Sequence, residues 1–117
     1  MTERLRRHID ILRAIKSCSK KQRKALLESA SKDQVHCLCE CVLNVLNGNV
    51  PIDCKKKEKL RKYKKVLYQL SIRKGKKKKG YWANKKNLLI QRGGFLPVLL
   101  GPILGIASSI LSNLISK

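Results

Sequence analysis

The sequence predicts a small all-α protein, and three observations support that fold class. Apolar residues recur every three or four positions near the N-terminus, at Leu5, Ile9, Leu12 and Ile15, which places them on one helix face. Two Ser–X–X–Gln segments have the form of helix capping boxes. A chain of 117 residues buries only a modest core, which favours packed helix pairs over a large sheet.

Residues 1–50 are predicted to form a helical head with three helices. The first helix carries the stripe described above, and the second follows the capping box at 19–22. The third follows the capping box at 31–34 and ends at Asn47-Gly48, because glycine adopts left-handed backbone at little cost. Its apolar stripe comprises Val35, Leu38, Val42, Val45 and Leu46.

Residues 51–72 are predicted to form a basic amphipathic helix that brings the total to about four helices. Asp53 can cap its start, and its apolar stripe comprises Leu60, Tyr63, Leu67 and Leu70. Residues 73–94 are crowded with lysine and interrupted by glycine, which predicts a basic flexible linker ending in a Gly-Gly junction.

Residues 95–117 form an apolar tail whose one charged residue is Lys117. Pro102 suits the first turn of an apolar C-terminal helix, and Ser and Asn residues line one side of that helix. Its length is marginal for a membrane span, and the polar stripe favours a helix that lies at or disturbs a bilayer. Alternatively, the tail docks on the head and completes its core.

The charge of the chain predicts a polyanionic partner. Lysine and arginine number 28 against 7 acidic residues, a net charge of +21. Residues 51–94 carry 17 basic and 2 acidic groups, net +15, which favours salt-sensitive contacts to phosphates without sequence readout. The predicted phosphate-binding residues are Lys55, Lys56, Lys57, Lys59, Arg61, Lys62, Lys64, Lys65, Arg73, Lys74, Lys76, Lys77, Lys78, Lys79, Lys85 and Lys86.

Two further features of this basic region allow more than one interpretation. The cluster from Arg73 to Lys79 also resembles a nuclear-import signal. Tyr81 and Trp82 follow it, and they can stack on bases, lie at a membrane interface or pack on the helices.

The cysteines do not have the spacing of a metal site. Cys37, Cys39 and Cys41 follow His36, but on a helix Cys39 points about 200° away from Cys37. Buried thiols that behave as small hydrophobic residues are the favoured interpretation, with metal binding or inter-subunit disulfides as alternatives. The sequence shows no catalytic constellation and no Gly-rich phosphate loop, so neither an enzyme nor a cofactor is expected.

One segment resembles a known family. RGGFLP at 92–97, followed by a short apolar tail after a Lys/Arg-rich body, resembles the X-like (mu-like) core proteins of adintoviruses and Polinton/Maverick elements. It is also similar to the adenovirus core protein X precursor, over roughly a third of the chain. The head has no adenoviral counterpart and looks like that of the element-encoded group.

The resemblance implies a non-enzymatic virion core protein that condenses double-stranded DNA and is located in the virion and the host nucleus. Capsid proteins and a maturation protease are the further partners it implies. That protease would cut after the pattern Gln91-Arg92-Gly93-Gly94, before Phe95, although the two glycines could equally form a flexible hinge. The alternatives are a membrane-active or tail-anchored basic protein and a cellular nucleic-acid adaptor with a zinc-stapled head.

Overall fold

The computed structural model describes residues 2–72 and 79–115, and it places the side chains of residues 3–72 and 79–105. These described residues form eight α-helices and one 3-10 helix, without a strand, so the all-α prediction is confirmed. In chain order the helices are α1 (Thr2–Arg7), α2 (Ile9–Ser17), α3 (Lys20–Glu28), α4 (Lys32–Leu46), α5 (Cys54–Arg61), α6 (Lys64–Ser71), α7 (Tyr81–Arg92), η1 (Gly93–Phe95) and α8 (Leu96–Ile115).

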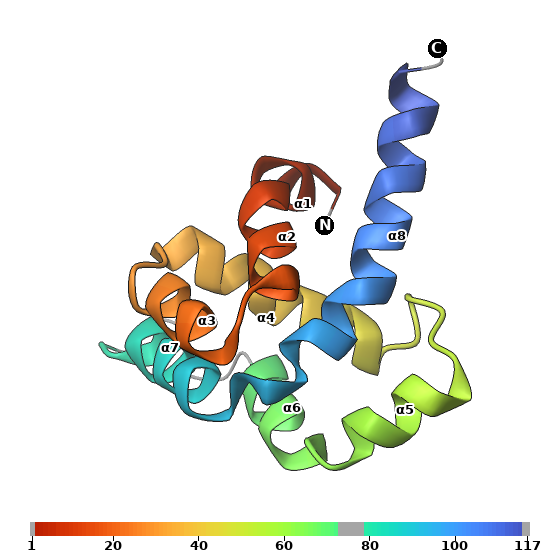
Figure 1. The fold of residues 1–117 in the computed structure, drawn as a ribbon. Coiled ribbons are helices and arrows are strands. Elements are labelled where there is room, and N and C mark those ends of the chain that lie inside the picture. Colours follow the sequence, from red (N-terminus) through yellow and green to blue (C-terminus); the bar gives the residue numbers. More distant parts are fainter. Residues whose placement is uncertain (1, 73–78, 116–117) are drawn as a thin grey trace.

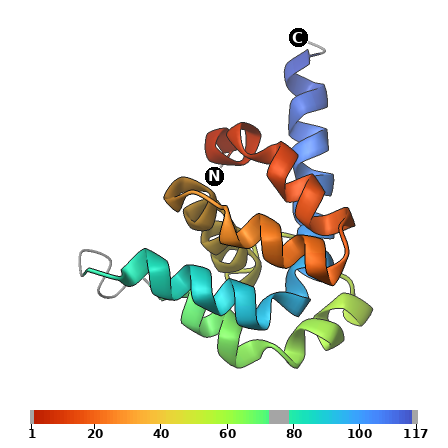
Figure 2. The same ribbon diagram turned by 60° about the vertical axis from the view of Figure 1, so that its left-hand side comes forward.

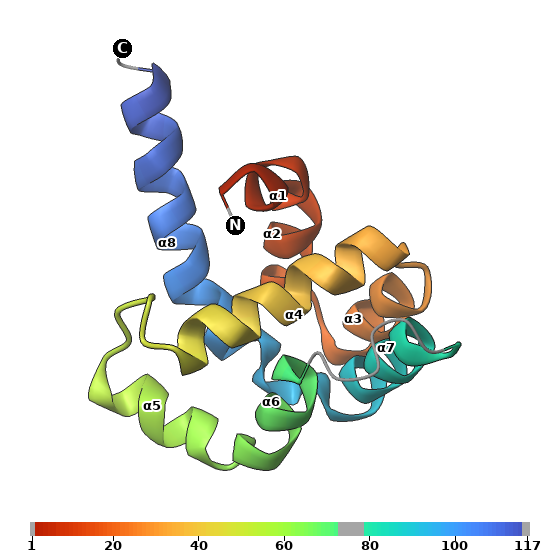
Figure 3. The same ribbon diagram turned by 180° about the vertical axis from the view of Figure 1, so that it is seen from behind.

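The start of α8 is the centre around which the other helices pack. Helices α1, α2, α4 and α5 all contact α8, while α6 packs on α4 and α7 packs on α3 and α4 (Figure 1). Figure 2 shows α3 and α7 side by side, and Figure 3 shows α4 crossing the molecule from behind. The later turns of α8 project beyond this body toward the C-terminus in all three views.

The two predicted capping boxes, the end of the third predicted helix and the cap at Asp53 are confirmed. The hydroxyl oxygens of Ser19 and Ser31 each accept a hydrogen bond from the backbone N–H three residues on, and both glutamines reach back to complete a capping box. Gly48 follows α4 with a φ of 75°, a left-handed conformation that favours glycine. The carboxylate of Asp53 accepts from the backbone N–H of Lys56 at 2.8 Å and caps α5.

The predicted number of helices was too low, partly because two expected helices are each divided. The first breaks at His8 and the basic one breaks at 62–63, where Tyr63 has φ −105° and ψ 13°. The two halves of the basic helix have different neighbours, because α5 packs on α8 whereas α6 packs on α4 and α7.

The prediction that all of 73–94 is a flexible linker was wrong, because residues 81–92 form α7. Gly80 turns the chain into this helix with a φ of 87°. Leu89 is fully buried, and Leu88 and Ile90 pack against the core. Lys85 and Lys86, two of the lysines in this segment, lie on a helix that packs on α3 and α4.

The boundary predicted between 94 and 95 is also absent from the fold, because the apolar segment begins in the core. Phe95, Leu96, Leu99, Leu100 and Ile103 have no measurable exposure. Helix α8 begins at Leu96, so Pro102 lies inside it rather than in its first turn as predicted. Residues 95–104 therefore complete the core of the head, which was the alternative interpretation of the tail.

The Gly-Gly junction is packed rather than open. A Cβ atom on Gly93 would lie 3.2 Å from the Leu96 side chain, and one on Gly94 would lie 3.0 Å from Oη of Tyr63. Both distances are shorter than ordinary contacts. The two glycines therefore let η1 approach Leu27, Tyr63 and Leu96 closely, with Gly93 buried and Gly94 exposed.

One stretch of the described chain is long and apolar enough, by length and composition alone, to cross a membrane. It runs from Tyr81 to Gly105, and 44% of its most apolar window is buried inside the molecule. The core packing of 95–104 accounts for that burial.

Candidate nucleic-acid interface

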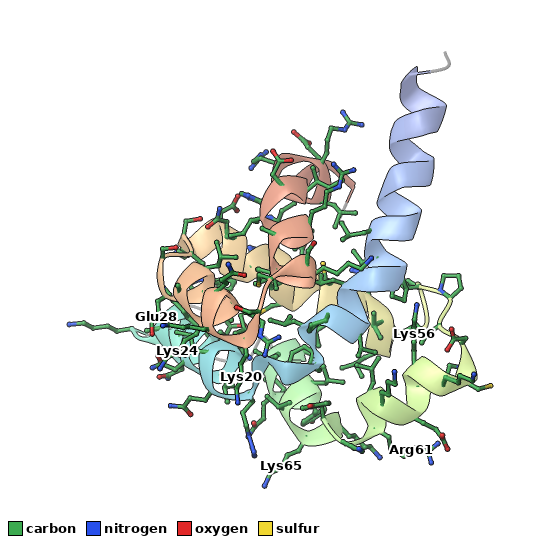
Figure 4. The ribbon with its side chains drawn as sticks, in the orientation of Figure 1. Lys20, Lys24, Glu28, Lys56, Arg61 and Lys65 are labelled. Atoms are coloured by element: carbon green, nitrogen blue, oxygen red, sulfur yellow. The ribbon has the colours of Figure 1, made fainter. Side chains whose placement is uncertain are left out.

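The first part of the candidate interface is the surface of α5 and α6. Three members of the predicted apolar stripe, Leu60, Leu67 and Leu70, are buried and fix these helices on the core. The cations cover the remaining sides, where Lys55, Lys57, Lys59, Arg61, Lys62, Lys64 and Lys65 are exposed and Lys56 is half-buried. In Figure 4, Arg61 and Lys65 point away from the body whereas Lys56 points toward α8.

The second part of the candidate interface is α3, none of whose cations was predicted to bind phosphates. Lys20, Lys21 and Lys24 are exposed and Arg23 is half-buried. These four cations line a groove of about 560 Å³ together with Tyr63, Arg92 and the Gly-Gly junction. The run KKQRK at 20–24 was visible in the sequence, but its position beside the end of α7 and Tyr63 was not.

The two parts form one basic surface, defined here as the cations of α3, Arg92 and the cations of residues 55–65. Tyr63 joins them, because it stands between α5 and α6 and also lines the α3 groove. Figure 4 shows Lys65 and Arg61 at the lower edge of the molecule, with Lys20 and Lys24 above them on the α3 side. Helix α3 and residues 54–71 hold twelve cations and two carboxylates, Glu28 and Glu58.

Within the part of the chain whose side chains the structure describes, the basic surface is not neutralised by ion pairs. Every ion pair recorded between described side chains joins Arg4, Arg7, His8 or His36 to Glu3, Asp33 or Glu40. None of them includes a cation of α3, α5 or α6. The electrostatic potential of these helices is therefore available to an external anion.

The paired charges lie where α1 and α2 meet α4. Arg4 forms an ion pair with Glu40 and lies 3.5 Å from Asp33. Nε2 of His8 lies 2.5 Å from Oδ2 of Asp33. The hydrogen bond with His8, with help from the nearby arginines, lowers the pKa of the Asp33 carboxyl below its ordinary value.

Lys85 does not belong to the interface, which corrects its prediction as a phosphate ligand. Its side chain is 6% exposed, and Nζ donates hydrogen bonds to the backbone carbonyls of Gln69 and, at 2.8 Å, Ile72. These carbonyls lie at the end of α6, where a cation also complements the helix dipole. Burial lowers the pKa of Lys85.

Lys86 is used in a similar way at the end of α3. Its Nζ donates to the carbonyl of Ala30 at 3.0 Å, and the residue is half-buried. Helix α7 thus directs one lysine to α6 and the next to α3, which holds three helices together. The structure therefore corrects the assignment of Lys86 to phosphate binding as well.

Most of the second predicted cluster lies outside the described residues. These members are Arg73, Lys74, Lys76, Lys77 and Lys78, whereas Lys79 is described and exposed. The aromatic pair that follows packs on the helices, one of its three predicted roles. Oη of Tyr81 donates to the carbonyl of Ile72 at 3.0 Å, and the ring of Trp82 lies 4.8 Å from that of His36.

The predicted protease site is folded. Gln91 and Arg92 end α7 and are exposed, but Gly93 is buried and Phe95 has no measurable exposure. Proteases bind an extended segment, whereas Gly93–Phe95 is a 3-10 helix. Cleavage between Gly94 and Phe95 therefore requires local unfolding.

The cysteine cluster is buried in α4. Cys37, Cys39 and Cys41 belong to the core, and the described residues contain no group of three or more His, Cys, Asp or Glu residues suited to a metal ion. A hydrogen bond with Cys37, together with burial, raises the pKa of the Cys41 thiol well above its ordinary value. A protonated, buried thiol behaves as a small hydrophobic side chain.

No protein-family model, curated protein or solved structure matches this chain.

Proposed function

We propose that this protein is a non-enzymatic DNA-binding protein that contacts the phosphates of double-stranded DNA through its basic surface. The observation that carries the proposal is the set of twelve cations on α3 and residues 54–71, none of which has a recorded ion-pair partner in the described chain. Concentrated charge of this kind opposes folding through self-repulsion, and a polyanion relieves that cost.

The dimensions of the molecule are compatible with a duplex. The molecule measures 29 Å along each of its two shorter axes. A DNA duplex 29 Å long carries about 17 phosphate charges, counted over both strands at one charge per ~1.7 Å. The lysines are point charges on flexible stems, so they suit a row of phosphates better than a particular base sequence.

This mode of binding predicts little discrimination between sequences and a steep dependence on salt. Each phosphate that is neutralised releases counterions, so six to ten contacts lower affinity about 10³- to 10⁵-fold between 50 and 200 mM salt. The resemblance to X-like core proteins extends the proposal to DNA condensation inside a virion, in contact with capsid proteins.

Fluorescence anisotropy with two unrelated duplexes of equal length tests the proposal. We expect equal affinities for both duplexes and a linear fall of log affinity with log salt. Affinity that is unchanged by salt, or strong preference for one duplex, would contradict phosphate binding by the basic surface.

A membrane-associated protein is the second candidate, and the projecting end of α8 favours it. Residues 106–115 continue an apolar helix beyond the body, away from Arg61 and Lys65 at the other end of the molecule. Flotation of the full chain with phosphatidylserine vesicles tests this candidate, and a chain ending at Gly105 is the matched control. Equal flotation of both chains would assign the binding to charge rather than to α8.

A further inference from the structure

A second groove lies between the C-terminal end of α4, the segment 47–53, and helices α5 and α6. Its volume is about 620 Å³. Leu46, Val50 and Leu60 are among its apolar lining, and Lys57, Arg61 and Lys64 are its charged residues. None of the described residues that line it is acidic. The groove therefore combines an apolar floor with a wholly cationic rim.

This region also holds the two large hydrophobic side chains that are most exposed in the described chain. Leu46 is 44% exposed and Tyr68 is 64% exposed. An adjoining hollow shares Leu46, Arg61 and Lys64 with the groove and adds Tyr68. Leu46 was predicted to be part of the core stripe of α4, but it lies in the last turn and contributes to this surface instead.

DNA phosphates do not explain these features. Phosphates are bound by charged and hydrogen-bonding groups and need no apolar surface, whereas exposed apolar residues gathered in one place are typical of protein-interaction surfaces. An apolar stripe flanked by carboxylates would fill the floor and pair with the rim, and an amphipathic helix presents such a stripe at positions i, i+3, i+4 and i+7.

We propose that this groove binds an acidic amphipathic helix of a protein partner. The apolar face of that helix packs on Leu46 in the groove and on Tyr68 in the adjoining hollow, and its carboxylates pair with Lys57, Arg61 and Lys64. The inference goes beyond DNA binding and does not depend on it, although the shared Arg61 and Lys64 make the two ligands compete.

The test uses the full chain and a labelled synthetic helical peptide with leucines on one face and glutamates elsewhere. A peptide of the same composition with leucines distributed around the helix is the control. Because both peptides carry the same charge, electrostatic attraction alone would bind them equally. We expect the amphipathic peptide to bind about tenfold more tightly in fluorescence anisotropy.

Variants of the protein locate the contact. Leu46→Ser and Tyr68→Ser should each weaken peptide binding about tenfold and leave DNA affinity unchanged, because no charge is removed. Ala25→Ser, an exposed site on α3, is the control and should change neither. Circular dichroism verifies that each variant is folded. Arg61→Gln should weaken the binding of both the peptide and DNA.

Several results would overturn the proposal. Equal binding of both peptides, or no effect of Leu46→Ser, would exclude an apolar contact in the groove. Loss of binding to phosphatidylserine vesicles in Leu46→Ser would assign the groove to a membrane, and loss of a dimer in sedimentation would assign it to a second copy. Failure of the wild type to bind DNA would leave the peptide result intact, so the two proposals fail separately.

Discussion

The lysines of α7 and those of α3, α5 and α6 are chemically identical but have opposite roles in the structure. Lys85 and Lys86 are enclosed by the fold and donate to backbone carbonyls at the ends of α6 and α3. Lys20 and Lys65 lie exposed on helices whose cations have no recorded ion pair in the described chain. Composition alone treats all four as one class.

The difference teaches that a high net charge is not uniformly available for binding. The fold uses some cations to satisfy helix ends and others, such as Arg4, to hold α1 against α4. Substitution of these groups should lower stability and leave the affinity of the folded protein for DNA unchanged. Substitution on the basic surface should lower the affinity for DNA and leave stability unchanged.

Arg4 should give the largest effect on stability. Arg4→Met removes the ion pair with Glu40 and the contact with Asp33, and loss of one partner of a half-buried pair costs about 3 kcal/mol. Urea denaturation measures the free energy of unfolding. Arg6→Met is the matched control on the exposed side of α1, and it should change stability by less than about 0.5 kcal/mol.

Substitution of Lys85 should have the second-largest effect on stability. Lys85→Met keeps the length of the side chain but leaves two carbonyls at the end of α6 without their donor, at a cost of about 2 kcal/mol. DNA affinity at a temperature where the variant is folded should equal that of the wild type. Lys79→Met removes the same charge from an exposed site, and a similar loss of stability there would refute a specific role of Lys85.

Lys86 should have a smaller effect of the same kind. Lys86→Met loses one hydrogen bond, to Ala30, and the residue is only half-buried, so the expected cost is about 1 kcal/mol. The melting temperature should fall while DNA affinity is retained. If affinity fell without loss of stability, Lys86 would belong to the basic surface after all.

The pH dependence of Asp33 should be the smallest effect. Because its pKa is lowered in the folded state, the unfolded chain binds more protons at acid pH, so this contribution is present above about pH 4 and is lost as pH falls further. The gap in melting temperature between the wild type and Asp33→Asn should therefore shrink between pH 6 and pH 3. A constant gap would show that the charge of Asp33 contributes nothing.

The sequence was sufficient for features that depend on neighbouring residues. The capping boxes of Ser19 and Ser31, the cap at Asp53 and the left-handed turn at Gly48 are local interactions, and all were predicted. The roles of Lys85 and of the α3 groove could not be predicted, because they join residues far apart in the chain. The burial of Phe95 was predicted only as an alternative, because an apolar segment looks the same whether it meets a membrane or a core.

The most direct test of the central claim compares two variants that lose the same charge from different surfaces. Lys20, Arg61 and Lys65 are changed together to Gln on the basic surface, and Arg6, Arg13 and Lys32 are changed together to Gln as the control, all from exposed positions. The slope of log DNA affinity against log salt should become about three units less steep in the first variant. It should match the wild type in the second. Equal slopes in the two variants would show that net charge, rather than this surface, binds DNA.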